Sequence, residues 1–339
     1  MVVFDVGDNV LNMKNTKVFV TGAGGFIGSH LCSYLIQLGA DVTAMLHYNS
    51  RSDWANLEFL PKEEKASLQI VRGNVEDAGF MDRHIKGMDT VFHLAALIGI
   101  PYSYEAPLSY IRSNIEGTVN VLEAVRKFDV GRLVHTSTSE TYGTARYTPI
   151  NEDHPLQAQS PYSATKISAD KLAESYYRSF EVPVTTLRPF NTYGPRQSAR
   201  AVIPTIISQL LTEDEVRLGE LRPVRDFNYV EDTVRGFIAA ATTPAAVGKV
   251  INVGHGKGIA IGDLVRILMK IMNVEKSIVA DKERIRPKDS EVFELVCDNS
   301  RAKELMGWSP KVSLREGLGR CVEFVEANAH LYKSGRYEV

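Results

Sequence analysis

The sequence predicts an α/β protein with a doubly wound parallel sheet and a smaller, discontinuous C-terminal domain. Three observations predict this class. Short β-branched runs alternate with longer helical patterns, as in βαβ units. The first run leads directly into a glycine-rich turn that opens a helix. After about Phe190 this rhythm gives way to a stretch punctuated by prolines, which indicates a second, differently built part.

Seven apolar runs predict the strands of the sheet. Their ranges are 17–21, 42–46, 68–71, 90–94, 132–136, 184–187 and 249–253. Helical periodicity predicts helices over 26–38, 115–128 and 161–180. The first helix stops at Gly39, which suits the residue after a helix end.

The strand at 249–253 is predicted to return to the sheet, so both domains are discontinuous. Residues 16–190 with about 228–255 are expected to form the larger domain, and 191–227 with about 256–335 the smaller one. Residues 1–15 are expected to be a flexible lead-in. They carry Asp5 and Asp8 but no basic region, which argues against a secretory signal.

Composition excludes several function classes. Lys+Arg 39 against Asp+Glu 41 gives a net charge of -2, which offers no basic field for nucleic acid or an anionic membrane. No apolar run approaches the ~20 residues of a membrane span. The three cysteines (Cys32, Cys297 and Cys321) lack CxxC spacing, which argues against a disulfide scaffold or a zinc site. We therefore expect a cytoplasmic protein without a metal.

The glycine-rich turn predicts a site for a dinucleotide. Glycines let the backbone approach a pyrophosphate, and the helix that follows offers free N–H groups and the positive end of its dipole. The strand–turn–helix context favours binding over a plain structural turn and predicts a Rossmann-type domain. The expected binding residues of this turn are Gly22, Gly25, Phe26, Ile27 and Gly28.

The end of the second strand bears on the choice between NAD and NADP. An acid there would bind the ribose 2′-hydroxyl of NAD, but Asp41 lies at the start of that strand. A 2′-phosphate could instead be held by the polar loop, with Arg51 as a charge-assisted donor. The loop residues concerned are His47, Asn49, Ser50 and Arg51. Both cofactors stay open, and the loop favours NADP.

Tyr162 and Lys166 lie one helical turn apart and form a candidate acid–base pair. A free tyrosine has a pKa of about 10. A neighbouring ammonium and the positive nicotinamide would lower that pKa, so that the phenolate can take a proton from a sugar hydroxyl. Upstream, directly after a predicted strand, Thr138 offers a hydroxyl to the reacting oxygen. Glu140 places a carboxylate beside the same centre, although it could equally be an inert loop charge.

Together these residues resemble the extended short-chain dehydrogenase/reductase family, the NAD(P)-dependent nucleotide-sugar epimerases and dehydratases. Gly22-x-x-Gly25-x-x-Gly28 has the spacing of that superfamily, and the similarity extends from about Thr16 to about Val325. Further matching motifs are His93–Ala96, Asn114-x-x-Gly117-Thr118, Arg188–Pro195, Arg225–Asp232, Arg286-Pro287 and Leu305–Pro310.

The resemblance implies roles for further residues and a homodimer paired through the helices at 115–128 and 161–180. It implies that the larger domain binds NAD(P) and the smaller one a nucleotide sugar. Leu94, Ala95 and Ala96 would lie beneath the nicotinamide, and Asn74 with Val75 would contact adenine, where the family often has Asp. The implied substrate-binding residues are Ser139, Asn191, Arg200, Arg225 and Arg286, with Arg225 and Arg286 on the diphosphate.

The residue at Glu140 bears on the reaction. Simple 4-epimerases usually have a small or hydroxyl residue there, whereas Thr138-Ser139-Glu140 is similar to the same tripeptide of GDP-mannose 4,6-dehydratases. Residues 100–104 and 191–200 look like those of UDP-N-acetylglucosamine 4,6-dehydratases of legionaminic acid synthesis. The resemblance therefore implies a 4,6-dehydratase that recycles a tightly bound cofactor. A 4-epimerase, a GDP-mannose-type 4,6-dehydratase and an idle NAD(P)-binding sensor remain the alternatives.

Overall fold

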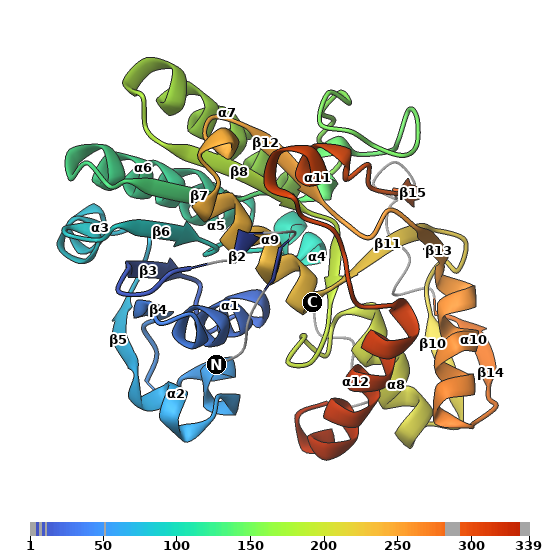
Figure 1. Cartoon of the computed structure of the whole chain (residues 1–339). Coiled ribbons are helices and arrows are strands. Elements are labelled where there is room, and N and C mark those ends of the chain that lie inside the picture. The colour runs from blue at the N-terminus through green and yellow to red at the C-terminus, as the bar shows by residue number, and fades with distance from the viewer. Residues whose placement is uncertain (1–4, 7–8, 11, 51, 282–291, 333–339) are drawn as a thin grey trace.

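A parallel sheet organises the larger part of the molecule (Figure 1). The computed structural model describes residues 5–6, 9–10, 12–50, 52–281 and 292–332. Within these residues the main sheet has seven strands in the order β5-β4-β3-β6-β7-β8-β12, all pairs parallel. The strands are β3 (Lys17–Thr21), β4 (Asp41–His47), β5 (Leu68–Gly73), β6 (Thr90–His93), β7 (Arg132–Thr136), β8 (Val184–Pro189) and β12 (Val250–Val253). The strand order reverses between β3 and β6, where α/β proteins bind ligands.

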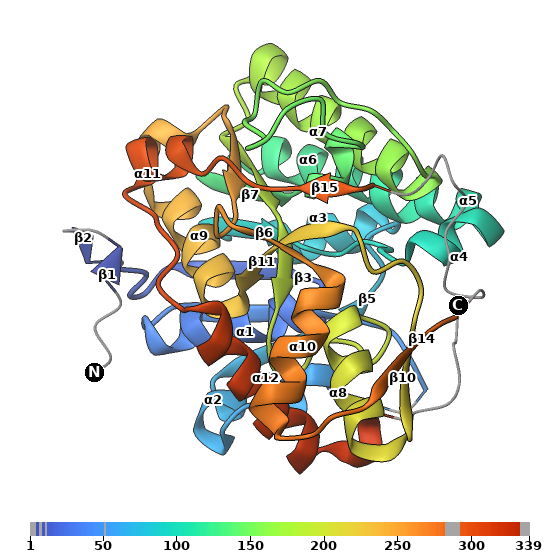
Figure 2. The ribbon, with the colours of Figure 1, turned by 90° about the vertical axis from the view of Figure 1, so that its right-hand side faces the viewer.

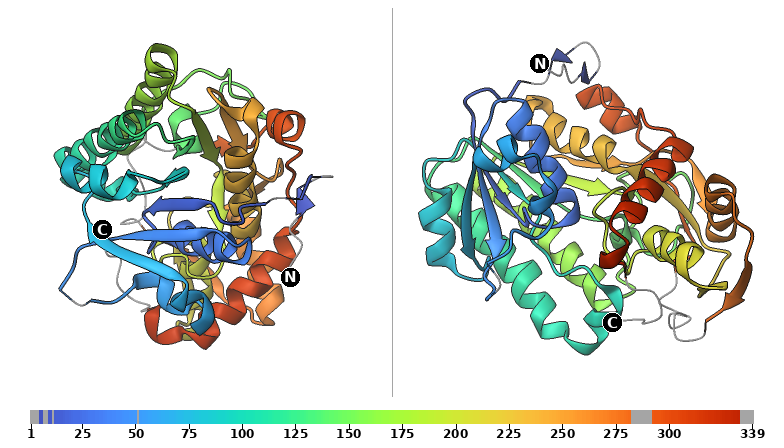
Figure 3. Two further views of the ribbon diagram at one scale, coloured as in Figure 1. Left: turned by 60° about the vertical axis from the view of Figure 1, so that its left-hand side comes forward. Right: turned by 90° about the horizontal axis from the view of Figure 1, so that it is seen from below.

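Helices cover both faces of this sheet, so the predicted doubly wound class is confirmed (Figures 1 and 3). α1 (Phe26–Gln37) and α9 (Val230–Thr242) pack together on one face. On the other face lie α3 (Ala78–Ile85), α6 (Gly117–Lys127) and α7 (Pro161–Phe180). The strands supply side chains alternately to the two layers: Val18 and Val20 belong to the first core cluster, and Phe19 between them belongs to the second.

The rest of the chain forms smaller sheets with their own helices (Figure 2). β11 (Val224–Tyr229) pairs with β13 (Gly258–Ala260), β15 (Glu294–Leu295) and β9 (Asn191–Tyr193). β10 (Glu215–Leu218) pairs with β14 (Ser277–Ala280). The helices here are α8 (Val202–Thr212), α10 (Ile261–Met272) and α12 (Leu314–Ala327). α11 (Ser300–Met306) packs instead against β12 and α9.

Short elements complete the described chain. They are β1 (Asp5–Val6), β2 (Asn9–Val10), η1 (Ala55–Phe59), α2 (Lys62–Ala66), α4 (Ile100–Glu105), α5 (Pro107–Tyr110), η2 (Ile111–Glu116), η3 (Ser139–Tyr142), η4 (Pro244–Ala246) and η7 (Ala329–Leu331). The segment η2 is a π-helix that leads directly into α6. No helix in the described ranges is long and apolar enough to cross a bilayer.

Several boundaries differ from those predicted. The helix expected from 115 is the end of a longer run through α5, η2 and α6. Sequence periodicity missed α3, which begins where the Asp77 side chain accepts the Phe80 N–H at 2.9 Å. Within the expected lead-in, β1 and β2 pair, and Met13 is only 3% exposed and joins the core. The folded chain therefore begins before Thr16.

Candidate active site

The glycine turn between β3 and α1 packs tightly against the end of β6. Gly22 has φ +70°, and a Cβ there would lie 2.8 Å from the Ala95 nitrogen. A Cβ on Gly28 would overlap the Gly22 carbonyl oxygen. Both positions therefore exclude larger residues, because the first helix turn lies directly against the loop.

The outer side of the same turn fits a dinucleotide pyrophosphate. Gly25 is exposed, and a Cβ there would have only the Gly22 oxygen nearby, at 3.1 Å. The N-terminus of α1 has neither a side-chain cap nor an acid in its first turn. The first amide groups of a helix have no partner within it, so those at Phe26 and Ile27 suit an anion.

The Gly28→Ala variant is expected to lose about 1–3 kcal/mol in the free energy of unfolding, because the added methyl meets backbone. It should also lose dinucleotide binding, measured by calorimetric titration with NAD. Gly319→Ala on α12 is the matched control, since a Cβ there meets no atom within 4 Å. A Gly28→Ala protein as stable as the parent would contradict the tight packing of the turn.

The ends of β4 and β5 lie side by side at the expected adenosine end. His47 pairs in register with Gly73, so Asn74 follows directly beside it. The Asn74 Oδ1 accepts the Glu76 N–H at 3.2 Å, which fixes the side chain in a turn. Val75 is buried, and its carbonyl accepts from Asn120. The predicted loop residues His47, Asn49 and Ser50 are exposed, and Arg51 lies outside the described residues.

A chain of hydrogen bonds joins the ends of β3 and β6 to the α6 layer. The Thr21 hydroxyl lies 2.9 Å from His93 Nδ1 and accepts the N–H groups of Leu94 and Ala95 at 3.1 Å. His93 Nε2 lies 3.1 Å from the Thr118 hydroxyl, which itself donates to a backbone carbonyl. His93 Nε2 therefore donates, and Nδ1 accepts from Thr21. The pKa of His93 lies well below its usual value, mainly because the ring is buried and secondly because of the charges of His135 and Lys166.

This network fixes the half-buried segment 94–97, including Ala96, next to the glycine turn. Asn114 on η2 clamps the same segment: its Oδ1 accepts the Leu97 N–H at 2.8 Å and its Nδ2 donates to the Leu97 carbonyl at 3.0 Å. The same Nδ2 donates to the Thr165 hydroxyl on α7 at 3.0 Å. The segment expected beneath the nicotinamide is thus tied to the helix that carries Tyr162 and Lys166.

α7 begins next to the site with a strong N-terminal signal. Ser160 and Ser163 form a reciprocal capping box, and Pro161 occupies the first turn. Tyr162 and Lys166, predicted as one helix turn apart, are both buried on the inner face. The Lys166 Nζ donates to the Thr136 carbonyl at the end of β7 at 2.6 Å.

Thr138, which caps the short helix η3, and Glu140 within that helix lie near Tyr162. Burial raises the pKa of Tyr162, a hydrogen bond with the Thr138 side chain lowers it, and the Glu140 charge raises it. The expected lowering of the Tyr162 pKa is therefore not found in the protein chain, where desolvation is the largest effect. The phenolate therefore requires a further positive charge nearby, such as that of an oxidised nicotinamide ring, to lower the Tyr162 pKa. Burial also lowers the pKa of Lys166 to about 8, while Asp170 raises it.

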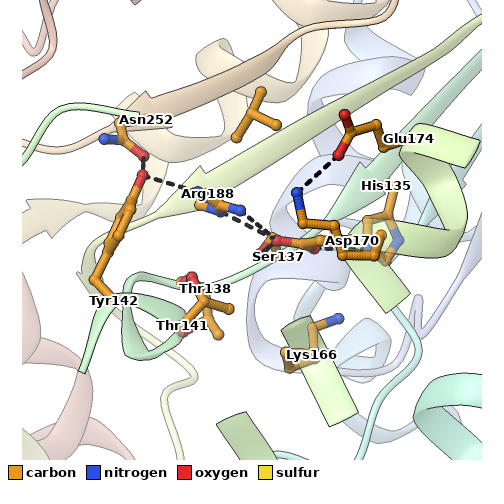
Figure 4. A network of polar contacts seen from close by, with 12 residues as sticks. His135, Ser137, Thr138, Thr141, Tyr142, Lys166, Asp170, Glu174, Arg188 and Asn252 are labelled. Atoms are coloured by element: carbon orange, nitrogen blue, oxygen red, sulfur yellow. Dashed lines mark hydrogen bonds and ion pairs between the residues drawn. The ribbon is translucent and has the colours of Figure 1, made fainter. Parts of the chain in front are cut away.

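Asp170 and Arg188 form a buried ion pair beneath this centre that sequence reasoning missed (Figure 4). The Asp170 carboxylate accepts from the Arg188 Nη2 at 2.8 Å, from the Ser137 hydroxyl at 2.6 Å and from His135 Nε2 at 3.2 Å. The sequence shows Arg188 only as part of a matching motif. A usable signal was present, because Asp170 follows Tyr162 and Lys166 at the same four-residue spacing on α7.

The expected substrate residues lie around the β8–β9 and β11 segments. Asn191 is half-buried, and its Oδ1 has no hydrogen-bond partner among the described residues. Arg225 is buried on β11 and donates to the Val224 carbonyl. Ser139 is buried on η3. Arg200 is exposed and lies near Tyr110: burial raises the pKa of Tyr110, and the Arg200 charge partly opposes that rise. Arg286 lies outside the described residues.

Two acids near Arg225 have structural roles. Asp226 accepts the N–H groups of His255, Gly256 and Cys297 at 2.7–3.0 Å. Asp232 accepts those of Lys311 and Val312 at 3.0 Å. They join β11 and α9 to the C-terminal segments.

Cys32, Cys297 and Cys321 are all buried, and no group of three metal-binding side chains occurs in the ranges that the structure describes.

Comparisons with known proteins agree with this arrangement. A family model described as GDP-mannose 4,6 dehydratase matches residues 19–321. A putative UDP-glucose 4-epimerase from Methanocaldococcus jannaschii is 30% identical over 92% of this chain and 99% of its own length. Among solved structures, a dTDP-glucose 4,6-dehydratase from Streptomyces venezuelae with NAD bound has a TM-score of 0.85 at 28% identity, covering 94% of this chain and 99% of its own.

A UDP-glucuronic acid 4-epimerase from Bacillus cereus, solved with UDP-glucuronic acid and NAD, has a TM-score of 0.83 at 30% identity. It covers 92% of this chain and 100% of its own. The similar proteins are thus both epimerases and dehydratases. Both of these solved structures hold NAD, so the preference for NADP drawn from the 47–51 loop gains no support from them.

Proposed function

The chain belongs to the NAD-dependent nucleotide-sugar epimerase and dehydratase family of extended short-chain dehydrogenases, and we propose that within it the protein is a nucleotide-sugar 4,6-dehydratase. An enzyme that modifies nucleotide sugars, either an epimerase or a 4,6-dehydratase, follows from the family. The choice of dehydratase rests on Glu140.

The position of Glu140 is the observation that carries the proposal. Its charge acts on Tyr162, so the carboxylate lies close to the expected reacting centre. It is half-buried on η3, two residues after Thr138, whose Oγ1 accepts the Glu140 N–H at 3.3 Å. A 4-epimerase needs no base at C5, whereas a 4,6-dehydratase does. A carboxylate held at this place supplies one.

In this mechanism each residue moves or holds a proton at a stated atom. Tyr162 takes the proton of the 4-hydroxyl, while Thr138 holds that oxygen and Lys166 favours the phenolate. NAD, held by the glycine turn and the 94–96 segment, would supply the hydride chemistry between C4 and C6. The C4 ketone acidifies C5–H, and Glu140 removes that proton. The protons balance: one is removed from O4 and one from C5. One proton then leaves with the 6-hydroxyl as water, and one is returned to C5.

For the substrate we propose UDP-N-acetylglucosamine, bound through its diphosphate by Arg225 and Arg286 and through the sugar region by Asn191, Ser139 and Arg200. Guanidinium groups suit a diphosphate because they donate paired hydrogen bonds. The buried, unpartnered Asn191 Oδ1 fits a donor from a ligand. We propose NAD as the cofactor, held by the glycine turn and the 94–96 segment, in a homodimer paired through α6 and α7.

Incubation with a panel of nucleotide sugars in deuterated water tests this proposal. With UDP-N-acetylglucosamine, mass spectrometry should show loss of one water and NMR should show deuterium at C5. Nucleotide released on denaturation should be NAD. If the only product were a C4 epimer of unchanged mass, the dehydratase proposal would be wrong and the epimerase would take its place.

A 4-epimerase is the second candidate, because the relatives that cover nearly the whole chain include a putative UDP-glucose 4-epimerase and a UDP-glucuronic acid 4-epimerase. It would use Tyr162, Lys166 and Thr138 in the same way and leave Glu140 idle. Water loss or epimerisation of a nucleotide sugar would also exclude the non-catalytic NAD(P)-binding sensor.

A further inference from the structure

The Asp170 carboxylate joins three functional segments at one buried point (Figure 4). Asp170 is 3% exposed and lies four residues after Lys166 on the same face of α7. It accepts from His135 Nε2 on β7 at 3.2 Å and from the hydroxyl of Ser137, the residue after β7, at 2.6 Å. From β8 it accepts the Arg188 Nε and Nη2 at 3.1 and 2.8 Å. One side chain thus connects α7, β7 and β8.

Ser137 and Arg188 lie shortly before residues that are expected to contact the substrate. Ser137 is the residue before Thr138, and Arg188 lies three residues before Asn191. Arg188 also donates to the Tyr142 hydroxyl at 3.0 Å, and its Cζ lies 4.9 Å from the centre of that ring. Tyr142 ends η3, the helix that carries Glu140. Asp170 therefore links the helix that carries Tyr162 to the segments that lead into η3 and β9.

The same carboxylate is the buried negative charge between two cations. It lies next to the Lys166 ammonium and pairs with the Arg188 guanidinium. His135 is neutral, because burial lowers its pKa and its Nδ1 has no partner among the described residues. The other titratable or charged groups that face this part of α7 are Glu140 and Tyr142 on η3, His93 on β6 and Tyr110 on α5.

We propose that Asp170 is a positioning residue of the active site, which sets η3 and β9 against α7 and supplies the charge that holds the Lys166 ammonium. The inference rests on the proposed acid–base role of Tyr162 and Lys166, and it applies to a dehydratase and an epimerase alike. Asp170 itself contacts neither sugar nor cofactor in this scheme, since its oxygens are used by Ser137, His135 and Arg188.

The Asp170→Asn variant tests the proposal through the pH profile of kcat/KM. Asp170 raises the pKa of Lys166 and also that of Tyr162. Without its charge both values fall. Both limbs of the profile should therefore move to lower pH by about one unit. The alkaline limb reports loss of the Lys166 proton, and the acid limb reports protonation of the Tyr162 phenolate. A lower maximum with both limbs unmoved would overturn the electrostatic role.

Ser137→Ala is the matched control, because it removes one neutral hydrogen bond to the same carboxylate. It should lower kcat several-fold and leave both limbs in place. Asp170→Asn leaves Arg188 buried without its counterion and can therefore impair folding. The double variant Asp170→Asn/Arg188→Gln removes both charges. Its alkaline limb should still move to lower pH, since Asp170 is the charge that acts on Lys166.

A second readout separates this inference from the proposed function. The ultraviolet absorbance of the Tyr162 phenolate, taken as the difference between NAD-bound protein and NAD-bound Tyr162→Phe, reports its titration without turnover. A lower phenolate midpoint in Asp170→Asn supports the inference even if no nucleotide sugar reacts. An unchanged midpoint in a protein that does turn over would overturn it and leave the proposed function standing.

Discussion

Tyr162→Phe is expected to lower kcat by roughly 10²- to 10⁴-fold, the range that a positioned general base contributes. Tyr162 is buried in the first turn of α7, hydrogen-bonded with Thr138 and one helix turn from Lys166. Phenylalanine keeps the ring but removes the oxygen that takes the 4-hydroxyl proton. KM for the nucleotide sugar should change little, because the diphosphate contacts remain. Steady-state kinetics on the panel described above measure both constants.

Tyr176→Phe is the matched control on the same helix, since its hydroxyl bonds to Glu123 on α6, away from the site. It should keep kcat within about twofold of the parent, as surface changes remote from chemistry do. Full activity in Tyr162→Phe would exclude the tyrosine from proton transfer in the dehydratase and the epimerase alike.

Glu140→Gln is expected to reduce water loss by roughly 10²- to 10⁴-fold, again the contribution of one positioned base. The amide has the size of the carboxylate but cannot remove the C5 proton. Oxidation at C4 does not require Glu140, so reduced cofactor should accumulate and be visible by its absorbance. Deuterium exchange at C5 should fall with the rate of water loss.

Glu174→Gln on the outer side of α7 provides the control, because that carboxylate pairs with Lys171 and Arg178 at the surface. It should leave both water loss and C5 exchange unchanged within about twofold. Normal exchange in Glu140→Gln would remove Glu140 from the base role and favour the epimerase.

Local sequence signals predicted much of the fold because each is set by neighbours along the chain. Strands β3 and β7 and helix α7 have the predicted bounds of 17–21, 132–136 and 161–180. The serines at 160 and 163 and the proline between them fix the start of α7 without help from elsewhere. The glycine turn was equally local, since strand, turn and helix follow one another within twelve residues, from Lys17 to Gly28.

The residues that could not be predicted are those whose role depends on distant partners. Thr21, His93 and Thr118 come from three separate elements, and only the strand order β3-β6 brings the first two together. Asp170 and Arg188 are likewise 18 residues apart and meet because α7 packs on β8. Sequence spacing within one element carries no information on such pairs.

The sequence by itself determined the doubly wound class, the glycine turn and the one-turn spacing of Tyr162 and Lys166, because these depend on backbone propensity and helix periodicity. The tertiary structure alone decided that Tyr162 and Lys166 are buried, that Glu140 lies near Tyr162, and that Asp170 and Arg188 underlie the site. The physical reason is desolvation: burial raises the pKa of Tyr162 and lowers that of Lys166, and burial is a property of the packed fold.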